Sequence, residues 1–194
     1  SPTPQPSASP TPSTQPSPTV TGTATRTATK SPTPTPTTRF VDNGNGTITD
    51  TMTGLTWEKQ SDDGGLHDKD TRYSWSVSGT TGPTGAVFAL ISTLNATRFA
   101  GYRDWRLPTL VELQSIVSRG AVSPGQPLVA PAFNNNCFPG CSVNQCSCTT
   151  ALNYWTSTPN ANYDQQAWYV LFNTGESGVA FKTLEFYARG VRGP

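Results

Sequence analysis

Charged residues and histidine are scarce in this sequence of 194 residues. Only 13% of the residues are Asp, Glu, Lys or Arg, the formal net charge is +1, and His67 is the single histidine. A sparse and balanced charge gives no electrostatic case for binding nucleic acid or an anionic membrane. One histidine in an acidic segment is poor material for a Ser-His-Asp arrangement. We therefore expect a non-catalytic protein without a cofactor or a nucleic-acid partner.

Long apolar runs are also missing, and none approaches the roughly 20 residues of a membrane-spanning helix. We expect no direct membrane span. Glycine and proline are abundant instead, with 17 and 18 copies. This balance is typical of a loop-rich extracellular domain.

Residues 1–38 are almost entirely Pro, Thr and Ser, and Arg26 and Lys30 are their only charges. Such a segment cannot bury enough apolar surface to offset its chain entropy. Repeated Thr-Pro and Ser-Pro steps favour extended, polyproline-like backbone. The pattern predicts a disordered stalk or a plain interdomain linker, followed by one folded domain over residues 39–194.

The four cysteines all lie in one short segment: Cys137, Cys141, Cys146 and Cys148. An even count in a polar loop predicts two local disulfides and an oxidising, extracellular or cell-surface location. A zinc knot and free thiols are the alternatives, but Cys-x3-Cys-x4-Cys-x-Cys is not a standard zinc spacing. Four cysteines permit three pairings, and the sequence does not choose among them.

The first part of the domain alternates apolar and polar residues around turn pairs. Asn43-Gly44 and Asn45-Gly46 predict a hairpin, with one strand around Ile48 and another over Leu55 to Trp57. The run also resembles part of a calcium loop, although Val41 and Met52 stand where carboxylates are needed. The acidic segment 61–70, which contains His67, could hold a metal, but we favour a solvated surface turn. We therefore expect no metal site.

Two helices are indicated. In the segment 83–99, apolar residues recur at three- and four-residue spacing and Thr84 is a plausible N-cap. The second helix follows the segment "DWRLPT". Thr109 and Glu112 there form a Thr-x-x-Glu capping box, and Pro108 requires extended backbone before it.

Trp105 and Arg106 immediately precede this second helix and allow two interpretations. In the structural one, the buried indole and an ion pair of Arg106 with a carboxylate hold a strand-to-helix corner together. In the functional one, Arg106 binds a ligand. We favour the structural role.

The last third of the chain is rich in short aromatic and β-branched runs, typical of strands. In "AWYVLF", Trp168, Val170 and Phe172 alternate with Tyr169 and Leu171, so both faces are apolar and a central strand is predicted. We expect structural roles for the remaining prominent residues of the strands, namely Trp57, Trp155, Trp168 and Arg192.

Five segments in this order resemble the Lcl C-terminal domain family over residues 40–193: "DNGNGTITDTMTGLTWEKQSDDGGLHDKD", "GYRDWRLPTLVELQSIV", "YWTSTP", "AWYVLFNTG" and "YARGVRG". The resemblance implies an α+β, C-type lectin-like fold, akin to the formylglycine-generating (sulfatase-modifying) group. Two helices would flank a small, twisted, mostly antiparallel sheet, and long loops would cover one end.

The same resemblance implies a bacterial adhesin that binds sulfated polysaccharide or a surface glycan and assembles as a trimer. The sequence departs from it in two ways, because the domain is not globally cationic and the tail lacks the Gly-X-Y repeat of collagen. Polyanion binding would need a local patch. Candidate ligand-binding residues are Arg98, Arg103, Arg119, Tyr163 and Arg189, although these arginines could also be scattered and merely solvated.

A non-catalytic binding module is therefore the leading hypothesis. The alternative is a structural or tip subunit of a surface assembly with protein partners. An enzyme of the formylglycine-generating type is less favoured, because those relatives use a core cysteine pair and here the cysteines lie in an insertion.

Overall fold

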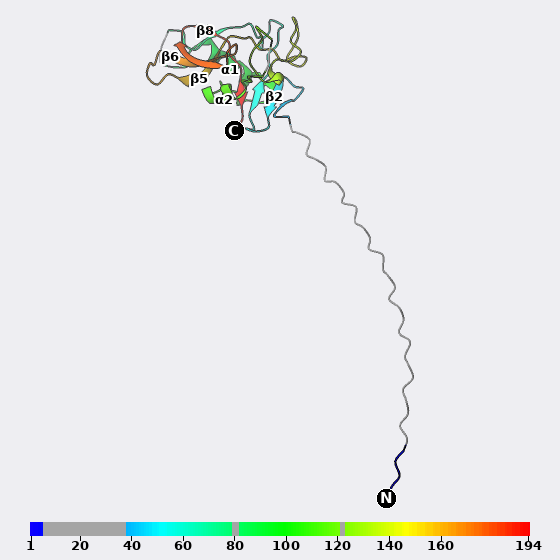
Figure 1. Ribbon diagram of the computed structural model, residues 1–194. Coiled ribbons are helices and arrows are strands. Elements are labelled where there is room, and N and C mark those ends of the chain that lie inside the picture. Colours follow the sequence, from blue (N-terminus) through cyan, green and yellow to red (C-terminus); the bar gives the residue numbers. More distant parts are fainter. Residues whose placement is uncertain (6–37, 79–81, 121–122) are drawn as a thin grey trace. The chain divides into compact units, whose positions relative to one another are not determined.

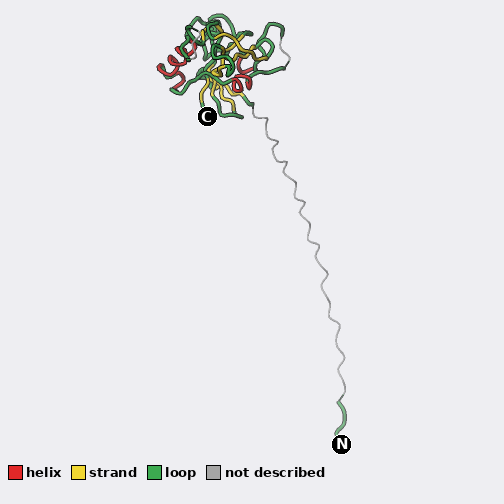
Figure 2. Tube along the Cα trace, turned by 90° about the vertical axis from the view of Figure 1, so that its left-hand side faces the viewer, coloured by secondary structure: helices red, strands yellow, loops and turns green. Residues whose placement is uncertain are grey.

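The computed structural model describes residues 1–5, 38–78, 82–120 and 123–194, and the chain divides into two units, Ser1–Thr35 and Pro36–Pro194. The predicted stalk falls mainly on residues 6–37, which lie outside the described residues. The second unit is mixed α+β, as predicted (Figure 1). Figure 2 shows that loops, drawn in green, make up more of this unit than helices do.

The first sheet joins the start of the domain to its end. Its strand order is β1 (Phe40–Asp42), β2 (Thr47–Asp50), β3 (Thr56–Glu58) and β9 (Val191–Arg192), all antiparallel. In Figure 1 the cyan N-terminal strands lie beside the red C-terminal strand. The predicted hairpin is confirmed, and Gly44 and Gly46 both have positive φ in its turn. Side-chain amides of the turn bond threonine hydroxyls of β2, as in the 2.8 Å bond from Asn43 to Thr47.

The second large sheet has the order β5 (Asn153–Pro159), β6 (Gln166–Leu171) and β7 (Glu176–Phe181). A small pair, β4 (Tyr73–Ser74) with β8 (Glu185–Phe186), forms a third sheet. The prediction of a central strand is confirmed, because β6 lies between β5 and β7. Val170 packs into one hydrophobic cluster and Ala167 into another, so both faces of β6 are covered along part of its length.

Helix α1 (Ala86–Ala96) buries Val87, Leu90, Ile91 and Leu94, the four positions that the spacing indicated. Its predicted N-cap, Thr84, is wrong, because Gly85 caps the helix and donates its backbone N–H to the carbonyl of Trp75 at 3.0 Å. A Cβ at this position would overlap the backbone of Ser74 and Trp75. Close backbone packing therefore selects glycine over a side-chain cap.

Helix α2 (Leu110–Ser115) begins at the predicted capping box, in which Thr109 accepts from the Glu112 amide and the Glu112 carboxylate accepts from the Thr109 amide. Arg106 donates two hydrogen bonds to the Glu112 carboxylate, of 2.6 and 2.7 Å. Its backbone pairs with Val191 of β9. Trp105 is buried and Pro108 lies beneath the helix start, so the residues of this corner occupy the positions that the structural interpretation required.

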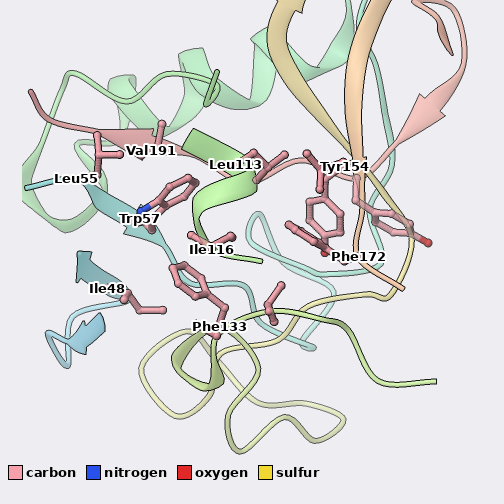
Figure 3. Packing of buried hydrophobic residues seen from close by; sticks show 13 residues of the cluster. Ile48, Leu55, Trp57, Leu113, Ile116, Phe133, Tyr154, Phe172 and Val191 are labelled. Atoms are coloured by element: carbon pink, nitrogen blue, oxygen red, sulfur yellow. The ribbon is translucent and has the colours of Figure 1, made fainter. Parts of the chain in front are cut away.

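Two hydrophobic clusters form the core. Figure 3 shows the first, in which Leu113 of α2 and Ile116, directly after α2, lie between Trp57 and Tyr154, with Phe133 of the short 3-10 helix η2 (Pro131–Phe133) below. The second cluster contains α1 and the remaining buried tryptophans, Trp75, Trp105 and Trp155. A second short 3-10 helix, η1 (Phe99–Gly101), follows α1.

Candidate functional site

The cysteine segment is closed by two nested disulfides, Cys137–Cys148 and Cys141–Cys146. The predicted number of disulfides is confirmed, and the structure supplies the pairing that the sequence left open. Cys141, Cys146 and Cys148 are buried together. Since the outer bridge joins residues 11 apart in sequence and the inner one residues 5 apart, the loop is restrained at both its base and its tip.

Arg189 lies beneath this loop and is fully buried. Its guanidinium donates to the carbonyl of Glu58 at 2.8 Å, to the carbonyl of Cys148 at 2.7 Å and to the hydroxyl of Thr149 at 2.7 Å. It also donates to the side-chain oxygen of Gln60 at 3.0 Å. Burial lowers the pKa of Arg189 from its ordinary value. The prediction that Arg189 belongs to an exposed ligand-binding patch is therefore wrong: its hydrogen bonds are all internal and join β3, the cysteine loop and the C-terminal segment.

A polar cleft of about 550 Å³ lies above these contacts. Side-chain amides and hydroxyls dominate its lining, together with one lysine and one aspartate. Its lining residues are Lys69, Asp70, Gly125, Gln126, Pro127, Asn134, Asn136, Cys137, Thr149, Thr150 and Ala151. We call this feature the polar cleft.

Hydrogen bonds within the protein fix several of the lining side chains. Asn134 donates to the Gln126 side chain at 3.1 Å and accepts from the Thr149 amide at 3.3 Å. Asn136 donates to the carbonyl of Gln145 at 3.1 Å, and Thr150 donates to the carbonyl of Lys69 at 3.0 Å. These bonds use only part of the capacity of each amide. The remaining polar atoms of these side chains are therefore held in fixed positions at the cleft.

The charges at the cleft compensate one another locally. The Lys69 ammonium lies 2.6 Å from a carboxylate oxygen of Asp70 and 3.2 Å from one of Asp62. Burial is the largest influence on the pKa of Lys69 and lowers it, but the hydrogen bonds to these two carboxylates more than offset it, so the pKa is raised. This edge of the cleft therefore offers donors and acceptors without a strong field of either sign.

The acidic segment 61–70 is an ordered turn held by its own carboxylates. Asp68 is buried and accepts the backbone N–H groups of Gly64 at 2.7 Å and Asp70 at 2.8 Å. His67 bonds the buried carboxylate of Glu58 at 2.6 Å and lies against the ring of Phe99. The predicted solvated turn thus proves to be partly buried, because its backbone donors need internal acceptors.

In the ranges that the structure describes, only one group of three or more potential metal ligands lies close together, the sulfurs of Cys137, Cys141 and Cys148. All three are bonded in disulfides. A disulfide sulfur does not supply the thiolate that a metal binds.

Comparison with known proteins places this arrangement in a family. The family model of the Lcl C-terminal domain matches residues 46–192. The chain belongs to the Lcl C-terminal domain family. No curated protein and no solved structure matches it. The matched range of the Lcl C-terminal domain includes the whole polar cleft, both disulfides and Arg189.

The other ligand-binding candidates of this Lcl C-terminal domain do not line the cleft. Arg98, Arg103 and Arg119 are exposed, and none of the three forms a salt bridge with another described residue. Arg98 precedes η1, and Arg119 lies beside Gly175 at the turn between β6 and β7. Tyr163 is exposed on the loop between β5 and β6.

The residues assigned structural roles divide into two groups. Trp57, Trp105 and Trp155 are buried in the core clusters, and Arg192 pairs with Asp104 at 2.7 Å while its guanidinium lies over the Tyr102 ring. Trp168 differs, since it is half-buried and lies in neither cluster. The structural role that we expect for Trp168 therefore stays a prediction.

Sequence reasoning missed the amides of the cleft. Gln126 and the run Asn134 to Asn136 lie more than 50 residues after Lys69 and Asp70 in the chain, and no spacing relates them. The three consecutive asparagines beside the first cysteine were the one local signal.

Proposed function

We propose that this domain is a non-catalytic binding module that recognises polysaccharide through the polar cleft. The observation that carries the proposal is the set of amide and hydroxyl side chains oriented at the cleft by internal hydrogen bonds. Sugar hydroxyls both donate and accept, and side-chain amides match them in both roles. A restrained loop lowers the entropy lost on binding, so a preformed cleft favours affinity.

An extracellular or cell-surface location fits this role. Two disulfides close the loop that borders the cleft, and such bonds persist in oxidising compartments. Within the described residues, no helix combines the length and the apolar character needed to cross a membrane. The proposal therefore describes a secreted or surface-displayed adhesin.

The finer fold assignment that accompanies this proposal is C-type lectin-like. Two helices with small antiparallel sheets, and a C-terminal strand paired to the N-terminal hairpin through β3, support it. The trimer that the family resemblance implies also stays a prediction. Light scattering on residues 39–194 would report the oligomeric state.

Sulfated polysaccharide is the ligand class that the family resemblance favours. Arg98 and Arg103 support it, because both are exposed and no carboxylate among the described residues pairs with them. Arginine forms bidentate hydrogen bonds with sulfate-like oxyanions. Such contacts weaken as salt screens them, so heparin retention that falls with ionic strength would identify this contribution.

We also propose that the domain has no catalytic activity. The histidine is bonded to Glu58 against an aromatic ring, and the carboxylates of Asp63 and Asp68 accept backbone N–H groups. The imidazole and these carboxylates therefore form the hydrogen bonds that stabilise the turn, which supports a structural role for them.

The test is a glycan array with residues 39–194, followed by calorimetry on the strongest hit. Asn136→Ala should weaken that binding about ten-fold, since one bidentate amide contact contributes roughly 1–2 kcal/mol. Asn173→Ala is the matched control, because Asn173 is exposed on the β6–β7 turn and does not line the cleft.

Two results would count against the proposal. The first is an array without any binding at low ionic strength, which would favour a structural subunit with protein partners. The second is an Asn136→Ala variant that binds as tightly as the control.

A further inference from the structure

One face of the β5–β6–β7 sheet is only partly covered. In the register of β6 and β7, Val170 lies opposite Ser177, Trp168 opposite Val179, and Gln166 opposite Phe181. Residues at these alternate positions point to the same side of the sheet. At one end, Val170 is buried in the first cluster, and Gln114 of α2 donates to Ser177 at 3.2 Å. The helix packs on this end, and its first residue, Leu110, also donates its backbone N–H to the hydroxyl of Thr158 in β5 at 3.0 Å.

The other end of the face carries exposed aromatic rings. Phe181 is 55% exposed, Tyr163 is 65% exposed, and Val179 is 38% exposed. Trp168 is half-buried, although the four other tryptophans all lie in the core clusters. In the register of the two strands, Trp168 pairs with Val179, two residues along β7 from Phe181 on the same side of the sheet. We call Tyr163, Trp168, Val179 and Phe181 the aromatic face.

A hollow of about 300 Å³ lies at the end of the aromatic face. Tyr163 and Phe181 line it together with Asn162, Asp164, Gln165 and Gln166. The loop that carries these residues is anchored from below, because the buried Lys182 ammonium donates to the carbonyl of Asp164 at 2.6 Å. Asn160 donates to the side-chain oxygen of Gln166 at 2.9 Å and fixes that amide.

We propose that this hollow and the aromatic face form a second binding site, for the pyranose rings of a neutral polysaccharide. The C–H face of a sugar ring stacks on an aromatic side chain, and its hydroxyls pair with the neighbouring amides. The charge of the lining selects the ligand class. The six described residues that line the hollow include no cation that could pair with a sulfate group, whereas their rings and amides suit an uncharged chain.

This site shares its ligand class with the proposed function but lies on other residues than the polar cleft. No residue lines both hollows. The domain would then have a site for neutral polysaccharide and, at another place on its surface, exposed arginines for sulfated polysaccharide. A single copy could bind both kinds of glycan. Failure at one site therefore leaves the other intact.

The experiment titrates residues 39–194 with cellohexaose and mannohexaose, with a chondroitin sulfate hexasaccharide as the anionic probe. Calorimetry gives the affinity, and the indole N–H signal of Trp168 reports contact. We expect a neutral hexasaccharide to bind and to shift the Trp168 signal. Tyr163→Ala with Phe181→Ala should weaken that binding at least about ten-fold. Leu184→Ala is the matched control, because Leu184 is also exposed, at 48%, and does not line the hollow.

The inference is overturned if neither neutral probe binds, if the double variant binds like the control, or if only chondroitin sulfate shifts the Trp168 signal. If the double variant is unstable, the test is the Trp168 indole N–H signal of the unaltered chain during titration with the neutral hexasaccharides. Asn136→Ala separates the two sites. Neutral binding that survives Asn136→Ala but not the double variant supports the aromatic face and leaves the polar cleft to its own array test, whereas the reverse pattern contradicts the aromatic face.

Discussion

The buried guanidinium of Arg189 donates a 2.7 Å hydrogen bond to the hydroxyl of Thr149, one of the residues that line the polar cleft. The same nitrogen bonds the carbonyl of Cys148 at the base of the disulfide loop. One side chain from the C-terminal segment thus fixes two successive residues of the loop. Arg189 supports the cleft from inside.

Arg189→Met should destabilise the domain by about 3 kcal/mol or more, because it leaves several buried acceptors without a donor. Chemical denaturation of residues 39–194 measures the change. Arg103→Ala, an exposed arginine without a salt bridge to any described residue, should leave the unfolding free energy unchanged. Equal stability of the two variants would refute the supporting role of Arg189.

The corner before α2 should behave as a structural element. Trp105→Ala removes a buried indole that bonds the carbonyl of Phe99 at 3.1 Å, and should cost about 3–5 kcal/mol. Thr109→Ala removes one half of the capping box and should cost about 1 kcal/mol. Thermal melts rank the two variants. An unchanged melting temperature of Trp105→Ala combined with lost ligand binding would reverse the assignment.

Removal of the two disulfides should affect stability and glycan binding at the polar cleft to different extents. By the loop-entropy relation, removing the longer bridge costs about 3 kcal/mol and removing the shorter one about 2 kcal/mol. Cys137 lines the cleft, and neither Cys141 nor Cys146 does. Cys137→Ala with Cys148→Ala should therefore reduce glycan binding more than Cys141→Ala with Cys146→Ala, as calorimetry would show.

Mass spectrometry can test directly whether the four cysteines are oxidised. The intact mass of the untreated domain should lie four hydrogens below that of the fully reduced chain. A mass equal to the reduced value would remove the support for an oxidising compartment.

Acid should weaken the domain through its paired carboxylates. The Arg106 guanidinium, followed by the backbone N–H of Thr109, holds the pKa of Glu112 below its ordinary value, and Arg39 does the same for Asp50. The unfolded chain therefore binds these protons more readily than the folded one, so stability is complete above about pH 5 and falls as pH drops below about 4.

Glu112→Gln isolates one of these contributions. The variant should be less stable than the unaltered domain at neutral pH, and its unfolding free energy should fall less steeply below about pH 4. Urea melts between pH 2 and 7 compare the slopes. Parallel slopes would show that the Arg106–Glu112 pair does not contribute to the acid response.

Local features of the fold could be read from the sequence because each depends on neighbouring residues. The hairpin follows from two Asn-Gly pairs, the start of α2 from Thr109 and Glu112, and the number of disulfides from four clustered cysteines. The cap of α1 could not be predicted, because the backbone of Ser74 excludes any side chain at Gly85. That contact joins segments which the sequence does not relate.

The two candidate sites depend even more strongly on contacts between residues that are distant in the sequence. An arginine near the C-terminus resembles any surface arginine until Cys148 and Thr149 are seen around it. Trp168 resembles the buried tryptophans in the sequence, and only the structure shows that it is half-buried and outside both core clusters. The amides that line the polar cleft come from separate loops and could be found only in three dimensions.

The most direct test of the central claim observes the side-chain amide signals of Gln126 and Asn136 while the domain is titrated with the oligosaccharide that the array selects. If the polar cleft is the recognition site, these signals shift in proportion to saturation, while the signal of Asn173 stays fixed. Saturable binding that leaves both cleft amides unmoved would contradict the account.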